Sequence, residues 1–163
     1  IMPRILKYEP NAKLYLSTYD NPVAHLRDFY AKCDLLATRL GPGVVSKLGA
    51  LTKAQLYEMY HAAGVYVYPT PSPFAPEFAE ISCISCMEAM ACGLPVVTSS
   101  SGALPETLGP GAGVLIPDTV NTPEYFDAFA AATLNYMRSP ERSRAASAAG
   151  VKRAEGLDWS GVA

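Results

Sequence analysis

Short apolar segments alternate with helical patterns along this chain, and the alternation constrains its fold more than any other feature. Strands are predicted at residues 12–17, 44–48, 65–68, 95–98 and 114–116, and the first of them is expected to be buried. Helices are predicted at 23–39, where apolar residues recur at helical spacing, from 52 to 62 or 63, around Glu88, from 122 to about 138 and from 139 onward, with a short helical turn around 105–108. Such alternation predicts an α/β fold, with a parallel sheet covered by helices on both faces.

Helix-start signals support these boundaries. Thr52 and Gln55 have the spacing of a capping box. Residues 122–124 read Thr-Pro-Glu, which places a cap, a first-turn proline and a first-turn acid in order, and Ser139 opens a similar sequence. The proline-rich stretch 69–76 is predicted to run extended, because proline lacks the N–H and restricts the residue before it.

Length, charge and composition argue against several classes of protein. A chain of 163 residues, half of them hydrophobic, is long enough for one domain with a core. The formal net charge of −2 shows no excess of positive charge for binding nucleic acid. No apolar run approaches the roughly 20 residues that cross a bilayer, and no signal-peptide pattern is present.

The segment from Glu80 to Thr98 is the most informative about function. It reads as a loop carboxylate, a helix containing Glu88, a Gly93-Leu-Pro95 stop and a short buried strand. The two acids, eight residues apart, correspond to about 12 Å of helical rise. Between them a helix begins, and its free N–H groups favour anions. This pattern suits a ligand with hydroxyl-rich ends and phosphates in the middle, as in a nucleotide-sugar.

The same segment resembles the Glu-x7-Glu signature of retaining glycosyltransferases of group 1, which have the GT-B fold. Glu80 and Glu88 match the two acids, and the run from Glu88 to Val97 matches the tail of the signature closely. The usual Phe-Gly after the first acid is Ile81-Ser82 here. The resemblance extends over most of the chain and implies a Rossmann-like three-layer domain, the C-terminal half of a GT-B fold.

The resemblance also implies roles for individual residues. Glu80 is expected to bind donor-sugar hydroxyls and is the candidate catalytic residue. The backbone N–H groups of Ile81, Ser82 and Cys83 are expected to meet the sugar and diphosphate, and Glu88 the ribose. The family works without a bound metal or cofactor, so neither is expected.

Four further positions are candidates for contacts with the base or the cleft. Gly49 and Leu51 follow the end of a predicted strand, where ligands of α/β sheets bind, although loop geometry explains the glycine equally well. Tyr68 is the tyrosine expected to face the cleft. Gly102 either lets backbone approach the donor or makes a turn.

Structural alternatives exist for the two acids. Ser85-x-x-Glu88 fits a capping box, in which case Glu88 caps its own helix. Glu80 could be a solvent-exposed loop acid, and Ser82 could cap the helix N–H groups. Glu77 offers a weaker alignment, because it lies eleven residues before Glu88. The proline-rich loop at 69–79 is either a lid over the donor or a rigid spacer.

The four cysteines are interpreted as reduced, small apolar fillers. Cys83 and Cys86 form a single CxxC pair in or beside one helix, without a second pair or a histidine at ligand spacing. The expected inward stripe of that helix consists of Ile84, Met87, Met90 and Ala91.

The charge distribution bears on the extent of the protein. No Lys or Arg occurs between Lys53 and Arg138, although a diphosphate usually requires a cation or a dipole. In the family the cations come from the start of the nucleotide-binding domain. Residues 1–163 are therefore expected to be a single partial domain truncated at both ends, with no transferase activity in isolation.

The function expected from these features is donor binding in a retaining hexosyl-type glycosyltransferase. The donor would be a nucleoside-diphosphate sugar, and the acceptor would be bound mainly by an absent N-terminal domain. The alternative is a non-catalytic nucleotide-sugar-binding or interaction module of the same fold. A cytoplasmic location is expected, with any membrane contact made through the missing domain.

Overall fold

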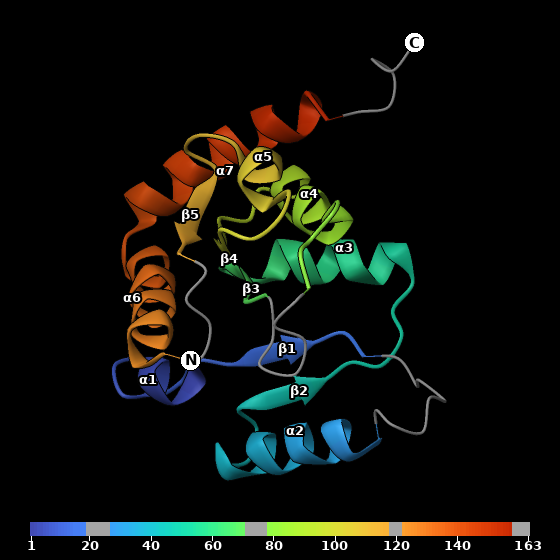
Figure 1. Cartoon of the computed structure of the whole chain (residues 1–163), viewed down its shortest axis with the longest axis vertical. Helices are drawn as coiled ribbons and strands as arrows, with labels where there is room; N and C mark the ends of the chain where they lie inside the picture. Colours follow the sequence, from blue (N-terminus) through green and yellow to red (C-terminus); the bar gives the residue numbers. More distant parts are fainter. Residues whose placement is uncertain (19–26, 71–77, 118–121, 158–163) are drawn as a thin grey trace. The chain divides into compact units, whose positions relative to one another are not determined.

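The computed structural model describes residues 1–18, 27–70, 78–117 and 122–157, and it divides the chain into two compact units. The N-terminal unit comprises Met2–Gln55, and the C-terminal unit comprises Leu56–Ala163 together with Ile1. Figure 1 labels the elements of both units. The prediction that residues 1–163 form one truncated domain stays a prediction.

The N-terminal unit contains two helices and a two-stranded parallel sheet. Its elements are α1 (Met2–Leu6), β1 (Leu14–Leu16), α2 (Arg27–Arg39) and β2 (Val45–Lys47). Leu14 pairs with Val45 and Leu16 with Lys47. Strand β1 was predicted to be buried, but Tyr15 and Leu16 are exposed, because β1 has only β2 as a hydrogen-bonded neighbour among the described residues.

The C-terminal unit contains a three-stranded parallel sheet in the order β3-β4-β5. Helix α3 (Lys53–Ala62) crosses the boundary between the units. It is followed by β3 (Tyr66–Tyr68), α4 (Ile84–Ala91), β4 (Val96–Ser99), α5 (Leu104–Leu108), β5 (Gly113–Ile116), α6 (Pro123–Arg138) and α7 (Pro140–Glu155). The parallel α/β prediction is confirmed, although the described strands form two sheets rather than one.

Strand β4 shows how both faces of this sheet are covered. Val96 and Val97 are adjacent and therefore point to opposite faces, yet both are fully buried. Val96 belongs to a cluster with Cys86, Met90 and other side chains of α4 and α5, whereas Val97 belongs to a cluster with Phe129 of α6. Helices thus lie on opposite sides of β4, as Figure 1 shows.

The predicted caps are formed. Thr52 Oγ1 accepts from the N–H of Gln55 at 3.3 Å, and Gln55 Oε1 accepts from the N–H of Thr52 at 3.0 Å, which closes the capping box of α3. Thr122 and Ser139 cap α6 and α7 through their side-chain oxygens. These local signals were readable because each acts over three residues.

The inward face of α4 differs from the prediction. Cys86, Ala89 and Met90 are buried, while Ile84 is 62% exposed and Ala91 is also exposed. The prediction was wrong for Ile84 and Ala91, because the sheet and α7 lie against the Cys86–Met90 side of the helix.

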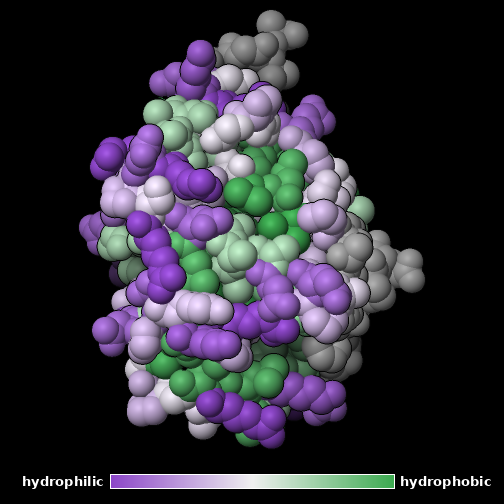
Figure 2. Space-filling model, turned by 90° about the vertical axis from the view of Figure 1, so that its left-hand side faces the viewer, coloured by the Kyte–Doolittle hydropathy of each residue, from purple (hydrophilic) through white to green (hydrophobic). Residues whose placement is uncertain are grey.

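Figure 2 shows a face on which hydrophilic side chains predominate and hydrophobic ones gather in patches among them. Among the described residues, no helix is both long and apolar enough to cross a membrane. The predicted turn at 20–22 and the segment 71–77, which includes most of the proline-rich loop and Glu77, lie outside the described residues.

Candidate functional site

Helix α4 positions the two predicted carboxylates of the C-terminal unit. Glu80 lies in the loop before the helix, and Glu88 lies in the helix itself. At the other end Gly93 has φ +79°, its N–H donates to Met90 O at 2.9 Å, and the N–H of Leu94 donates to Ala89 O at 3.0 Å. This is the helix stop expected from Gly-Leu-Pro.

Glu80 is half-buried and held by several hydrogen bonds. Its Oε2 accepts from the Tyr68 hydroxyl at 2.7 Å. Its Oε1 accepts from the N–H groups of Ile81 and Ser82, at 3.1 and 3.2 Å. The alternative that Glu80 is merely a solvent-exposed loop acid is therefore wrong.

Those contacts also bear on the predicted phosphate-binding groups. The N–H groups of Ile81 and Ser82, which the resemblance assigns to the sugar and diphosphate, donate here to Glu80. Cys83 is the N-cap residue of α4, and no side chain caps this helix start. The alternative of a Ser82 cap is therefore wrong. The N-terminus of α4 presents the partial positive charge that favours an anion.

Gly102, in the turn between β4 and α5, lies against the backbone of Glu80. Its φ is +53°, and a Cβ added there would stand 2.1 Å from Glu80 O. The next residue, Ala103, donates its N–H to that same oxygen at 2.7 Å. Gly102 thus makes a turn, as one alternative held, and the backbone that it allows to come close is that of Glu80.

Glu88 is half-buried on α4 and contacts α3. Tyr57 of α3 donates its hydroxyl to Glu88 Oε1 at 3.5 Å. The proposed Ser85–Glu88 capping box is not formed, because Ser85 lies inside the helix, with its hydroxyl 2.7 Å from that of Tyr66. Glu88 is therefore not a cap of its own helix, and the predicted ribose contact stays a prediction.

The CxxC cysteines belong to the core rather than to a metal site. Cys83 and Cys86 are free thiols, 3% and 0% exposed, in the cluster between α4, β4 and α5. The hydrogen bond with Cys83 and burial raise the pKa of Cys86 above its usual range. No group of three or more potential ligand side chains that could hold a metal is found among the described residues.

Sequence reasoning missed Ala103 and Tyr57. The signal for Ala103 was available: β3 and β4 are parallel neighbours, so Tyr68 and the turn after β4 lie at the same sheet edge, where ligands bind. For Tyr57 no local signal exists, since it is 31 residues from Glu88.

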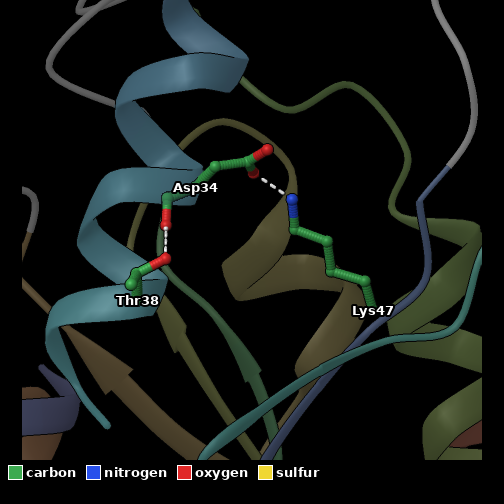
Figure 3. A network of polar contacts seen from close by, with 3 residues as sticks. All are labelled: Asp34, Thr38 and Lys47. Atoms are coloured by element: carbon green, nitrogen blue, oxygen red, sulfur yellow. Dashed lines mark hydrogen bonds and ion pairs between the residues drawn. The ribbon is translucent and has the colours of Figure 1, made fainter. Parts of the chain in front are cut away.

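Gly49 and Leu51 lie in the N-terminal unit, and their predicted contact with a base stays a prediction. A hollow in the same unit is lined by Asp34, Thr38, Lys47 and neighbouring residues. Figure 3 shows that Asp34 of α2 forms an ion pair with Lys47 of β2, while Thr38 donates to Asp34 O at 2.9 Å. The two charges of this hollow neutralise each other.

Comparison with known families gives a match over most of the chain. Residues 27–153 match the family described as glycosyl transferases group 1. An O-antigen chain mannosyltransferase B of Escherichia coli is 32% identical over 117 residues, which are 72% of this chain and 27% of that protein. A GDP-mannose-dependent phosphatidylinositol monomannoside mannosyltransferase of Corynebacterium glutamicum is 27% identical over 159 residues, 98% of this chain and 38% of that protein.

Solved structures give the same fold. Sucrose-phosphate synthase of Thermosynechococcus elongatus superposes with a TM-score of 0.78 at 25% identity, covering 98% of this chain and 38% of that one. A pneumococcal O-GlcNAc transferase in complex with UDP and GlcNAc superposes with a TM-score of 0.63 at 20% identity, covering 93% and 28%. The chain spans between about a quarter and two fifths of the length of these proteins.

Proposed function

The chain belongs to the glycosyl transferases group 1 family, and from that premise we propose that it binds the donor of a retaining hexosyl-type glycosyltransferase. The donor is a nucleoside-diphosphate sugar. The observation that carries the proposal is the placement of two half-buried carboxylates around one helix start, with Glu80 in the loop before α4 and Glu88 within it.

Each part of the donor has a matching group. Ionised carboxylates only accept hydrogen bonds, so Glu80 suits sugar hydroxyls and Glu88 suits those of the ribose. The N–H of Cys83 and the dipole of α4 suit the diphosphate, while the N–H groups of Ile81 and Ser82 act through Glu80, to which they donate. Gly49 and Leu51 remain the candidates for contact with the base.

The chemistry breaks the bond between the sugar and the diphosphate, forms a bond from the sugar carbon to the acceptor oxygen, and moves the proton of the acceptor hydroxyl to the departing diphosphate. The departing diphosphate carries negative charge, and donors already oriented toward it stabilise that charge without reorganisation. No cofactor or metal is part of the proposal. The acceptor is bound mainly outside these residues, in a protein that works in the cytoplasm.

One sequence relative and one structural neighbour indicate which donors to test first. The Corynebacterium glutamicum relative is named for GDP-mannose, and the pneumococcal structure holds UDP and GlcNAc. GDP-mannose and UDP-N-acetylglucosamine are therefore the first probes, each compared with its nucleoside diphosphate.

Calorimetric titration of these four ligands into the protein and its Glu88→Ala variant tests the proposal. Loss of a hydrogen bond to a charged group costs about 1.5–3 kcal/mol, so binding should weaken roughly 10- to 100-fold. Glu106→Ala is the matched control, since Glu106 is an exposed acid in the first turn of α5. Absence of binding, or binding unaffected by Glu88→Ala, would contradict the proposal.

A non-catalytic nucleotide-sugar-binding module is the second candidate. It is favoured by the departure at Ile81-Ser82 from the usual Phe-Gly after the first acid. Release of free sugar from a bound donor by the full-length protein distinguishes the two, because a binding module leaves the donor intact.

A further inference from the structure

Once its contacts with the described residues are counted, the Glu80 carboxylate has one acceptor position left. An ionised carboxylate offers about four lone-pair sites, two on each oxygen. The N–H groups of Ile81 and Ser82 take both sites of Oε1, and the Tyr68 hydroxyl takes one site of Oε2. A ligand that leaves these contacts intact can therefore donate one hydrogen bond to Oε2.

Tyr68 is suited to donate a lasting hydrogen bond to Oε2 of Glu80. Burial, followed by the hydrogen bond to Glu80, raises the pKa of Tyr68 well above its usual range, which further favours the protonated, donating form of the phenol. Its ring stacks on that of Tyr66, with centroids 6.3 Å apart and an interplanar angle of 15°. The stacked ring limits where the hydroxyl can lie.

The turn after β4 holds the same residue from its backbone side. Ala103 donates to Glu80 O at 2.7 Å. A Cβ on Gly102 would lie 2.1 Å from that oxygen and 2.6 Å from Glu80 N, closer than non-bonded atoms can approach. Only glycine at position 102 leaves room for the Ala103 contact.

We propose that Tyr68 and Gly102 are positioning residues, which hold Glu80 so that it receives a single hydroxyl of the donor sugar on Oε2. The inference rests on the proposed function of Glu80 in sugar binding. It gives both residues a role through Glu80 in place of direct contact with the donor. The contribution of Glu80 to the choice of sugar then depends on one hydroxyl of the donor.

The quantity to measure is the sugar ratio, defined as the Kd of the nucleoside diphosphate divided by the Kd of the corresponding nucleotide-sugar. This ratio separates the contribution of the sugar to the binding free energy from that of the nucleotide. A general loss of protein stability therefore does not change the ratio. GDP with GDP-mannose and UDP with UDP-N-acetylglucosamine are the probes, titrated into the full chain by calorimetry.

Tyr68→Phe removes the hydroxyl and keeps the ring. We expect it to lower the sugar ratio about three- to tenfold, the size of one hydrogen bond, with the Kd of the diphosphate unchanged. Tyr66→Phe is the matched control, since it deletes a hydroxyl from the neighbouring stacked ring that contacts Ser85 rather than Glu80.

Gly102→Ala should lower the sugar ratio by at least as much, because the added methyl must displace Glu80. Gly111→Ala is its control: Gly111 also has a positive φ, of +83°, but its added Cβ would meet Ala149 Cβ at an ordinary 3.5 Å. Both glycine variants thus carry backbone strain, and only the first displaces Glu80.

Adding Tyr68→Phe to Glu80→Ala shows whether Tyr68 acts through Glu80. We expect no further fall in the sugar ratio, because the residue being positioned is already gone. A further fall would mean direct contact between Tyr68 and the sugar and would overturn the inference. So would a sugar ratio that drops in Glu80→Ala but not in Tyr68→Phe or Gly102→Ala, a result that leaves the proposed function standing. If the wild-type chain binds none of the four probes, both fail together.

Discussion

At the scale of single residues, tyrosine hydroxyls contact both of the predicted carboxylates. Glu80 accepts a hydrogen bond of 2.7 Å from Tyr68, while the bond from Tyr57 to Glu88 is 3.5 Å long, at the limit of a hydrogen bond. Glu80 also has two backbone donors on its other oxygen. Both oxygens of the acid that the proposal assigns to the sugar therefore accept hydrogen bonds from described residues.

The two candidate acids could be chosen from the sequence, but their hydrogen-bond partners could not. Glu80 and Glu88 were found from their spacing, because the signature is local. The Ser85 hydroxyl looked like a cap three residues before Glu88, yet it contacts Tyr66, which is 19 residues away. Side-chain choices of this kind depend on tertiary neighbours, which a local pattern does not contain.

The four thiols provide a prediction at this scale. Cys83 and Cys86 are buried, whereas Cys33 and Cys92 are partly exposed. We expect a thiol reagent at pH 8 to modify Cys33 and Cys92 in the native protein, and the other two only after denaturation. Peptide mapping by mass spectrometry identifies the modified sites. Equal labelling of all four thiols without denaturant would contradict the burial of Cys83 and Cys86.

At the scale of elements, strands and helices were predicted where their signals are local. The helix starts at Thr52, Thr122 and Ser139 were correct because caps act within one turn. The buried side of α4 was partly wrong because a short helix with apolar residues on several faces does not specify which face meets the sheet. Likewise, nothing in the sequence of β1 showed that its side chains would be exposed.

Two glycines of the C-terminal unit give predictions of opposite sign. Gly150 lies inside α7, and a Cβ there would meet Met90 at an ordinary 3.5 Å. Gly150→Ala should therefore raise the free energy of unfolding by about 0.5–1 kcal/mol through helix propensity. Gly113 of β5 has no such room, since its Cβ would lie 2.0 Å from Val96 O.

Gly113→Ala should accordingly lower the free energy of unfolding by about 1–3 kcal/mol or more, as overpacking does. Urea titrations of both variants and the wild type measure the effect, provided that the slope of the transition is unchanged. The same sign for both substitutions would contradict the packing of α7 on α4 or of β5 on β4.

At the scale of the whole molecule, the Lys and Arg residues lie far along the sequence from the two carboxylates of the proposed site. No Lys or Arg occurs between Lys53 and Arg138. Within the C-terminal unit the basic residues lie at the end of α6 and on α7, and Arg153 of α7 donates to the carbonyls of Glu106 and Thr107. The described contacts thus direct this guanidinium to the end of α5.

This separation leads to a last prediction, which concerns the 163 residues as a catalyst. A departing diphosphate needs its charge stabilised, and the helix dipole at α4, equivalent to roughly half a charge, offsets only part of it. We therefore expect these residues by themselves to bind a nucleoside diphosphate weakly and to transfer no sugar. Incubation with GDP-mannose or UDP-N-acetylglucosamine and candidate acceptors, followed by mass spectrometry, measures this. A full-length group 1 relative, assayed in parallel, controls for the conditions. Turnover by the isolated chain would place the missing positive charge within residues 1–163, and Arg and Lys substitutions in α1, α2 and β2 would then locate it.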